Sequence, residues 1–478
     1  MHRHTASFDL IVIGAGSGGL SVSLGLLELG LKVLMIDKSD WHIGGECLNT
    51  GCVPSKALIH ISRLIQQGKN AQPFGYQLDG KTDMLAVKQY ISEKQQSIKA
   101  HENTAFLRKQ GLNIVLGTAH FVEKDTLEVE GKCYKGKNIV IATGSSPRKL
   151  DVVGLEKHKV FTNENIFELD YLPENFLFVG AGPNSIELGQ AFARLGSKVT
   201  IVDRGEKILS KDDPAITHVL QQQLIQENIT FFFNSEIENF SQSEAIIKNK
   251  NGDTSSVPVD AVFTGIGRIL NFEDLHLQNA GVKTKEGKIQ VNDRLQTTNP
   301  QVFVCGDAAG SLKFSHAAEL HATVLINNFL SPFKKKLELK HFPWVTFADP
   351  EVATFGLNEG QLKKKNTAYE RLEMDFQEDD RATTDNYQYG KLILFVEKKR
   401  FNIGAAKILG GSMVAPHAGE MTQELILANT TGMPIKEIFN KVYAYPTSGR
   451  VNKKIILERY RKLVKPWLHL IIRVLYRF

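Results

Sequence analysis

The chain has 478 residues, 42% of them hydrophobic and 23% charged, so it has room for several domains and lacks the composition of a disordered protein. Its four cysteines are too few for the disulfide framework of a small secreted protein. The formal charge of +6 is concentrated at one end, because residues 451–478 contain eight Lys or Arg and one acid, which leaves 50 basic and 51 acidic residues elsewhere and argues against a nucleic-acid-binding body.

The N-terminal segment enters an apolar run at residues 8–13 that is too short for a secretory signal. No apolar stretch approaches the roughly 18–20 residues of a membrane-spanning helix. We therefore expect the protein in the cytoplasm.

The first motif is a strand, a glycine turn, a helix and a second strand that ends in an acid. The strands are expected at 8–13 and 33–36, with the helix running to residue 30. Glycines at this spacing permit a tight turn, close approach to a pyrophosphate and close helix packing, and the acid stands where it can bind a ribose hydroxyl. The pattern predicts a dinucleotide site rather than a glycine-rich surface turn, with these residues: Gly14, Gly16, Gly19 and Asp37.

Two cysteines, Cys47 and Cys52, follow in residues 44–56. Five residues of regular helix rise about 7.5 Å, beyond the ~7 Å reach of a disulfide, so a bond between them needs a distorted turn that Gly51 and Pro54 can supply. Two structural thiols and half of a metal site are the other interpretations. Because no second Cys/His pair at zinc spacing accompanies them, we expect no metal site and favour redox chemistry.

The dinucleotide pattern recurs with strands at 176–179 and 199–202, and Ser185 replaces the third glycine. Two such units imply two dinucleotides, and a protein that holds FAD and NAD(P)H is suited to passing a hydride into a flavin. Asp203 at the end of the second strand favours NADH, whereas the adjacent Arg204 suits the 2′-phosphate of NADPH. We favour NADH.

These motifs closely resemble the class I pyridine nucleotide–disulfide oxidoreductases, which include dihydrolipoamide dehydrogenase, glutathione reductase and mercuric reductase. The resemblance covers about residues 8–450. It implies an α/β fold with two Rossmann-like domains, for FAD and NAD(P), and an α+β dimerisation domain. The implied organisation is an FAD-binding domain at 1–150 and 271–341, an NAD(P)-binding domain at 151–270, a dimer-interface domain at 342–450, and a basic amphipathic tail at 451–478.

The resemblance also implies further cofactor-binding residues. Residues 117–119 resemble the loop near the FAD adenosine, 142–145 the flavin-contacting turn, and 302–308 the second FAD motif, while 265–268 resemble the turn that closes the nicotinamide domain. The residues implied are Ala119, Thr143, Gly144 and Asp307 for FAD, Gly180, Gly182, Asp203 and Gly267 for NADH or NADPH, and Lys56 with Glu187 between the two.

The catalytic roles are likewise implied by the resemblance. Hydride passes from the nicotinamide to the flavin and on to the disulfide, where Cys52 is the charge-transfer thiol and Cys47 is the interchange thiol that meets the acceptor. Lys56 and Glu187 pair beside the flavin, and a solvated helix lysine is the alternative for Lys56.

One departure concerns the acceptor. Where family members that reduce disulfides have a His and a Glu as the acid–base pair, this chain has Tyr445 and Arg450. An unperturbed tyrosine titrates near pH 10 and is a poor base at pH 7. His417 is a residual polar candidate, although an interface position is the favoured interpretation for it.

The motif around Tyr445 looks closest in character to mercuric-reductase-like members, although the C-terminal vicinal cysteines of true mercuric reductases are absent. We therefore expect a homodimeric oxidoreductase whose acceptor is a small-molecule or protein disulfide, a quinone or a soft metal ion such as Hg(II). The alternatives are a membrane-associated redox sensor or scaffold with low turnover, and a dihydrolipoamide dehydrogenase that lacks the usual His base.

The tail places apolar residues on one helical face and Lys or Arg on the other, and Pro466 is expected to divide it into two helices. A membrane-surface helix with Trp467 at the interface is one interpretation. A helix packed on the dimer domain is the other.

Overall fold

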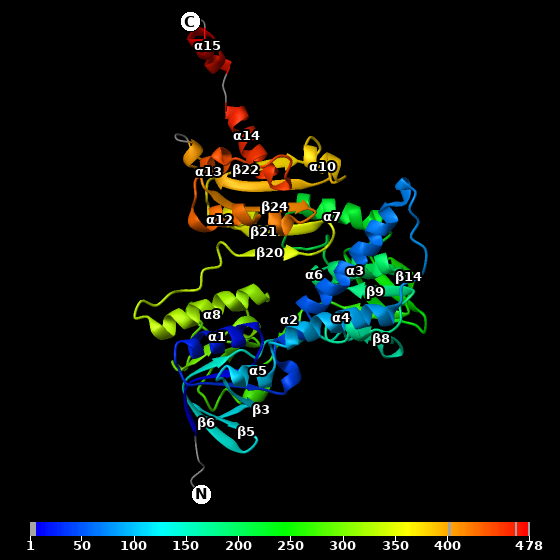
Figure 1. Cartoon of the computed structure of the whole chain (residues 1–478). Coiled ribbons are helices and arrows are strands. Elements are labelled where there is room, and N and C mark those ends of the chain that lie inside the picture. The colour runs from blue at the N-terminus through cyan, green and yellow to red at the C-terminus, as the bar shows by residue number, and fades with distance from the viewer. Residues whose placement is uncertain (1–5, 400–402, 464–465, 477–478) are drawn as a thin grey trace. The chain divides into compact units, whose positions relative to one another are not determined.

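The computed structural model describes residues 6–399, 403–463 and 466–476. The chain forms two compact units, each built from segments that are distant in sequence (Figure 1). Unit one comprises Met1–Gly180, Arg194–Val202 and Glu236–Glu338. Unit two comprises Ala181–Ala193, Asp203–Ser235 and Leu339–Phe478.

The first sheet of unit one has the strand order β3–β2–β1–β6–β5–β4, and β19 pairs with β6. β3, β2, β1, β6 and β19 are parallel, whereas β5 and β4 are antiparallel. The parallel strands read as continuous apolar runs because both of their faces are buried. The strands are β1 Ala6–Ile13, β2 Val33–Asp37, β3 Asn113–Leu116, β4 His120–Glu123, β5 Thr126–Val129, β6 Lys132–Ile141 and β19 Val302–Val304.

Helices α1 and α8 pack together and share one hydrophobic core with this sheet. The β1–α1–β2 connection is the crossover unit that parallel neighbouring strands require. The glycine turn between β1 and α1 therefore lies at the carboxyl edge of the sheet, where ligands of open α/β sheets bind. The helices of unit one are α1 Ser17–Glu28, α2 Gly45–Asn49, α3 Cys52–Asn70, α4 Met84–Lys99, α5 Thr104–Lys109 and α8 Ser315–Leu330.

A second parallel arrangement in unit one has β10, β9, β15 and β8 side by side in that order. Its interior is aromatic, with the rings of Phe176 and Phe178 4.7 Å apart and those of Phe178 and Phe263 5.1 Å apart. The remaining strands form small antiparallel sheets, β12–β13–β14, β16–β7 and β17–β18. The strands are β7 Ser145–Pro147, β8 Lys159–Phe161, β9 Asn175–Val179, β10 Lys198–Val202, β12 Ser235–Phe240, β13 Glu244–Asn249, β14 Thr254–Pro258, β15 Ala261–Thr264, β16 Arg268–Leu270, β17 Thr284–Lys285 and β18 Lys288–Ile289.

Unit two contains an antiparallel sheet with the order β20–β21–β24–β23–β22. Its strands are β20 Pro343–Thr346, β21 Glu351–Gly356, β22 Tyr369–Asp375, β23 Lys391–Glu397 and β24 Ile408–Ala415, and β11 Thr230–Phe232 also belongs to this unit. Its helices are α6 Pro183–Leu195, most of which lies here, α7 Pro214–Gln226, α9 Glu359–Lys364, α10 Asp380–Thr384, α11 Ala418–Met421, α12 Gln423–Thr431, α13 Ile435–Asn440, α14 Val451–Leu463 and α15 Pro466–Leu475.

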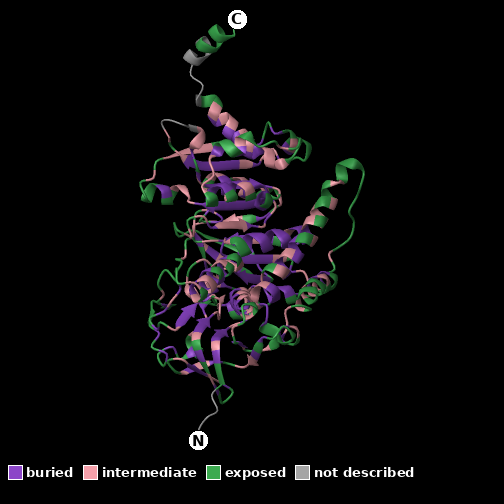
Figure 2. Ribbon diagram, turned by 60° about the vertical axis from the view of Figure 1, so that its left-hand side comes forward, coloured by how far each residue is buried: buried purple, intermediate pink, exposed green. Residues whose placement is uncertain are grey.

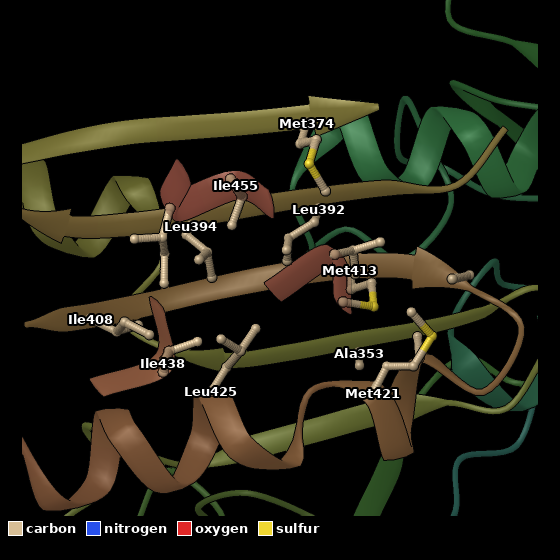
Figure 3. Close-up of a cluster of buried hydrophobic side chains, with 14 of the residues drawn as sticks. Ala353, Met374, Leu392, Leu394, Ile408, Met413, Met421, Leu425, Ile438 and Ile455 are labelled. Atoms are coloured by element: carbon tan, nitrogen blue, oxygen red, sulfur yellow. The ribbon is translucent and has the colours of Figure 1, made fainter. Parts of the chain in front are cut away.

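The core of unit two lies between this sheet and its helices. Figure 3 shows Leu392 and Leu394 of β23 with Met413 of β24, Leu425 of α12 and Ile455 of α14 in one cluster. Buried residues likewise concentrate in the strands of both units (Figure 2). The predicted α/β class, with two strand–glycine–helix motifs and a C-terminal α+β part, is confirmed.

Candidate active site

The glycines of the first turn pack closely against backbone atoms of the turn itself and of Ala142. Gly14 has φ +105°, and a Cβ atom there would lie 2.3 Å from the Ala142 carbonyl oxygen. A Cβ atom on Gly19 would lie 1.8 Å from the Gly14 carbonyl oxygen. A Cβ atom cannot lie so close to a carbonyl oxygen, so both positions require glycine for steric reasons.

Asp37, at the end of β2, is bound to this turn. Its Oδ2 accepts a hydrogen bond of 2.6 Å from the Ala15 N–H, and its Oδ1 accepts one of 2.6 Å from Lys38 N–H. Burial raises the pKa of the Asp37 carboxyl, an effect that these two N–H groups oppose. Gly117 donates its N–H to the Asp37 carbonyl at 2.8 Å, which brings the loop predicted to lie near adenosine, residues 117–119, next to the acid. The Ala119 side chain in that loop is buried in the hydrophobic core.

The glycine turn also contacts the segment that carries the cysteines. Gly44 donates its N–H to the Ala15 carbonyl at 3.0 Å, and a Cβ atom on Gly45 would lie 2.5 Å from Gly16 Cα. Helix α2 begins at Gly45, so the predicted dinucleotide turn and the predicted redox segment are packed directly against each other.

The regular helix is interrupted between the two cysteines. Helix α2 ends at Asn49 and α3 begins at Cys52, and Gly51 between them has φ −133° and ψ −110°. A Cβ atom on Gly51 would lie 2.9 Å from the Glu46 carbonyl oxygen. This is the distorted turn that the spacing of Cys47 and Cys52 requires.

Cys47 is half-buried and Cys52 is exposed. A hydrogen bond between the two thiols, together with burial, raises the pKa of Cys47. Cys52 Sγ lies 3.5 Å from the Ser315 hydroxyl, at the first residue of α8. Cys133 and Cys305 are buried, and burial raises the pKa of Cys305 to about 12. Of the four cysteines, Cys47 and Cys52 are therefore the two that are not buried, and their redox role stays a prediction.

A network of ionic and polar groups lies behind the pair. Glu46, next to Cys47 in the chain, accepts hydrogen bonds from both terminal nitrogens of Arg268, one of them at 2.9 Å, and from Asn163 Nδ2 at 3.0 Å. Arg268 also donates from Nε to the Ser145 hydroxyl at 2.6 Å. Burial raises the pKa of Glu46 to about 7, and Arg268 opposes that rise.

The second predicted FAD motif meets this network at Asp307. The Ser145 hydroxyl donates to Asp307 Oδ2 at 2.5 Å, and Ser145 directly follows Thr143 and Gly144 in the chain. The structure therefore brings the predicted flavin-contacting turn and Asp307 together. The turn carrying Asp307 is supported by His321 of α8, whose Nδ1 accepts the Gly306 N–H at 3.1 Å. His321 is fully buried, and burial lowers its pKa to about 4.

The second glycine turn has the same acid arrangement but looser packing. Asp203 Oδ2 accepts a hydrogen bond of 2.6 Å from the Ala181 N–H. A Cβ atom on Gly180 would lie 2.7 Å from the Gly265 carbonyl oxygen, whereas Gly182 has no atom within 4 Å of such a Cβ. Gly267 has φ +109° and is equally open.

The remaining predicted residues lie in separate surroundings. Lys56 is half-buried on α3 of unit one. Glu187 is buried on α6 of unit two, where its Oε1 accepts the Phe347 N–H at 2.8 Å. Their pairing stays a prediction. Tyr445 is 68% exposed, and the Arg450 guanidinium lies 4.7 Å from the centre of its ring. His417 has φ +57° just before α11.

Among residues 6–399, 403–463 and 466–476, no three His, Cys, Asp or Glu side chains are grouped in a way that could bind a metal ion. In the same residues, no helix has both the length and the apolar character needed to cross a bilayer.

The residues present fit a dinucleotide such as FAD in unit one. The glycine turn has no room for side chains at Gly14 and Gly19, its first helix begins at Ser17 with N–H groups at the turn, and Asp37 stands at the ribose-binding position. Sequence reasoning assigned no role of their own to Glu46, Arg268, Ser145, Ser315 and His321, although the predicted motifs at 44–56, 142–145 and 265–268 contain the first three. Only Glu46 could have been linked to the cysteines from the local sequence, since it is next to Cys47, whereas Arg268 and Ser315 are more than 200 residues away from their partners in the chain.

Comparisons with known proteins agree with this geometry. The family model described as pyridine nucleotide-disulphide oxidoreductase matches residues 8–322, and the dimerisation domain of the same family matches residues 342–454. The chain is 30% identical over 449 residues to mercuric reductase of Lysinibacillus sphaericus, covering 92% of this chain and 80% of that protein. It is also 30% identical over 466 residues to dihydrolipoyl dehydrogenase of Mycoplasma pneumoniae, covering 95% and 100%.

Solved structures show the same fold. The HOCl-induced flavoprotein disulfide reductase RclA from Escherichia coli matches with a TM-score of 0.82 and 23% identity, over 94% of this chain and 99% of that one. A Cu(II) complex of RclA matches with a TM-score of 0.83.

Proposed function

The chain belongs to the pyridine nucleotide–disulphide oxidoreductase family, and we propose that it is an NAD(P)H-dependent flavoenzyme that reduces an external acceptor through Cys47 and Cys52. The family implies FAD and a nicotinamide coenzyme, and FAD when bound supplies the relay of an electron pair between the nicotinamide and the cysteines. The contact between the glycine turn and α2, at Gly16 and Gly45, is the observation that carries this proposal.

Each group of residues has a role in the proposal. Gly14, Gly16, Gly19 and Asp37 hold the adenosine diphosphate half of FAD, while Thr143, Gly144, Asp307 and the backbone at Ala119 hold the rest. Gly180, Gly182, Asp203 and Gly267 hold the nicotinamide coenzyme, and Lys56 and Glu187 lie between the two cofactors. Cys47 and Cys52 give two electrons to the acceptor and become a disulfide, which the next coenzyme molecule reduces.

We favour a soft metal ion as the acceptor. A disulfide acceptor leaves as thiolates that need protons from a general acid nearby, whereas reduction of a soft cation by two thiolates needs none. Tyr445 and Arg450 stand where related disulfide reductases have an acid–base pair, and Arg450 lies over the Tyr445 ring. The mercuric reductase relative and the Cu(II) complex of RclA support this choice.

The test uses the purified holoenzyme under anaerobic conditions. NADH or NADPH should bleach the flavin, and if neither does, the flavoenzyme proposal is wrong. Turnover is then measured with Hg(II), Cu(II), quinones, glutathione disulfide and dihydrolipoamide. Cys47→Ser and Cys52→Ser should remove turnover while Cys133→Ser, at a buried thiol, should not. Disulfide turnover that matches metal turnover would reject the soft-metal preference, and slow turnover with every acceptor would favour a sensor or scaffold.

We infer that the coenzyme is NADH. Asp203 is held at the second turn through both carboxylate oxygens, by the Ala181 and Gly205 N–H groups at 2.6 Å each. A carboxylate in that position binds a free ribose 2′-hydroxyl and repels a 2′-phosphate. Asp203→Ala should shift the kcat/KM ratio towards NADPH. If Arg204→Ala abolishes a preference for NADPH in the native enzyme, the inference is wrong.

We also infer a homodimer, formed through the dimerisation domain at 342–454. The segment around Tyr445 is strongly exposed, with Val442 at 90%, as expected for a surface that a second copy covers. Sedimentation velocity of the holoenzyme tests it, because a monomer at all concentrations contradicts the inference.

A further inference from the structure

The basic charge of the tail, residues 451–478, is divided between its two helices. Three of the five cations of α14 are already engaged within unit two. Arg459 is 3% exposed and donates to Glu370 at 2.6 Å, and Lys454 pairs with Asp379 at 2.7 Å. Lys453 donates to the Lys441 carbonyl at 3.2 Å. These three charges serve the fold.

The apolar face of α14 is also occupied. Val451, Ile455 and Ile456 are at most 2% exposed and belong to the core of unit two. Figure 3 shows Ile455 in the same cluster as Leu392 and Leu394 of β23. The described apolar side chains at 451, 455 and 456 in this half of the tail therefore pack on the domain.

Helix α15 differs in every described side chain. Ile471, Ile472, Val474 and Leu475 are 43–66% exposed, and Tyr476 is 87% exposed (Figure 2). These four large apolar residues lie within five positions, separated only by Arg473, and such an exposed group is unusual on a protein surface. The nearest described cations, Arg461, Lys462 and Arg473, are exposed as well.

We propose that α15, together with Arg461 and Lys462 before it, binds the surface of a membrane that contains anionic lipids. Apolar side chains of such a helix enter the boundary between head groups and acyl chains, and the cations meet the lipid charges. Ten helical residues are about 15 Å long, half of a bilayer core, so the helix lies along the surface rather than crossing it.

Charge complementarity selects the lipid surface over a second copy of the chain. Outside the tail the chain has 50 basic and 51 acidic residues, so its body offers no acidic excess for a cationic helix. The family's dimerisation domain ends at residue 454, before α15 begins. An anionic bilayer provides both the negative charge and the apolar layer that α15 requires.

The experiment is vesicle co-sedimentation of the holoenzyme, with phosphatidylcholine alone and with added phosphatidylserine. Native protein should sediment with the anionic vesicles, less so at high salt. Ile471→Asp with Val474→Asp should abolish sedimentation, and Arg473→Gln should weaken it about fivefold. Phe333→Asp is the matched control, because Phe333 is 83% exposed outside the tail and should leave binding unchanged.

Flavin reduction by the coenzyme should remain normal in all of these variants, which separates this proposal from the proposed function. Unchanged vesicle binding after deletion of residues 466–478 would overturn the proposal. Native protein that sediments with neither kind of vesicle would also overturn it. In that case, a sedimentation coefficient that falls when residues 466–478 are deleted would assign α15 to a contact between copies of the chain.

Discussion

The two glycine turns of this chain begin alike and end differently. Each follows a parallel strand, and each has an aspartate at the end of the next strand that accepts the N–H of the alanine in the turn at 2.6 Å. At the third glycine position, however, the first turn has Gly19, with no room for a Cβ atom, and the second has Ser185.

The two turns therefore differ in how tightly they are packed. The first turn is in contact with its own helix, with Ala142 and with the cysteine helix, and nothing larger than glycine fits at Gly14 or Gly19. The second tolerates a serine side chain and leaves Gly182 open. A closed turn suits a cofactor that stays bound, and a looser one suits a coenzyme that must leave in every cycle, as the proposed function requires.

We expect the largest effect when the third glycine position of the first turn receives the serine found in the second turn. Gly19→Ser would place a Cβ atom 1.8 Å from the Gly14 carbonyl oxygen, and overpacking against backbone should cost about 3 kcal/mol or more. We expect loss of bound FAD and a lower Tm, measured by the flavin-to-protein absorbance ratio and by thermal unfolding. Ser185→Gly is the matched exchange and should keep FAD. Full flavin content in Gly19→Ser would refute the closed-turn interpretation.

Arg268 follows Gly267 in the turn predicted to close the nicotinamide domain, yet its side chain contacts Glu46 and Ser145 of the first site. Arg268→Ala leaves Glu46 and Asp307 without their cation. Losing one partner of a buried pair costs about 3–5 kcal/mol, and we expect about 2 here because 37% of the Glu46 side chain is exposed. Denaturant unfolding measures the change. Arg268→Lys should recover part of it, and equal stability of the alanine variant and the native protein would show that the network contributes nothing.

The free energy of unfolding should depend on pH through His321, which supports the turn carrying Asp307. Burial lowers its pKa from 6.5 to about 4, so its contribution to stability is present above pH 6.5 and is lost as the pH falls towards 4. The loss amounts to roughly 3 kcal/mol at most. His321→Asn keeps an acceptor for the Gly306 N–H but does not titrate, so its free energy of unfolding should fall less over this range. His60→Asn, on the exposed surface of α3, should behave as native. Identical slopes for native protein and His321→Asn would contradict this account.

The smallest expected effect lies at the second turn. Ser185 is fully buried, and within the described residues its hydroxyl has no hydrogen-bond partner. Ser185→Ala removes an unsatisfied polar group and should stabilise the protein by about 1 kcal/mol, seen as a higher Tm. Ser23 of α1 has the same features, so Ser23→Ala should give a similar gain. A lower Tm at Ser185→Ala would mean that the hydroxyl has a ligand.

The sequence predicted the features that depend on neighbours in the chain. The glycine turns, their aspartates and the interrupted helix at Cys47–Cys52 follow from spacing rules that act over a few dozen residues. It did not predict the contacts made by folding. Arg268 is 222 residues from Glu46, and Ser315 is 263 residues from Cys52, so no local pattern links them.

The tail illustrates a different limit. Its apolar and basic residues follow one helical period on both sides of Pro466, and periodicity alone does not tell a face that packs on a domain from one that meets another surface. Burial separates them, because α14 is in the core of unit two and the described side chains of α15 are exposed. The pairing of Lys56 with Glu187 stays a prediction.

The contact between Gly16 and Gly45 has a consequence for inheritance. A mutation that enlarges Gly45 disturbs the dinucleotide turn and the cysteine helix at once, because a Cβ atom there would lie 2.5 Å from Gly16 Cα. Tyr445, which is 68% exposed with the Arg450 guanidinium over its ring, belongs to neither glycine turn. Under the proposed function, substitutions near residue 445 would change the electron acceptor and leave the electron supply unchanged.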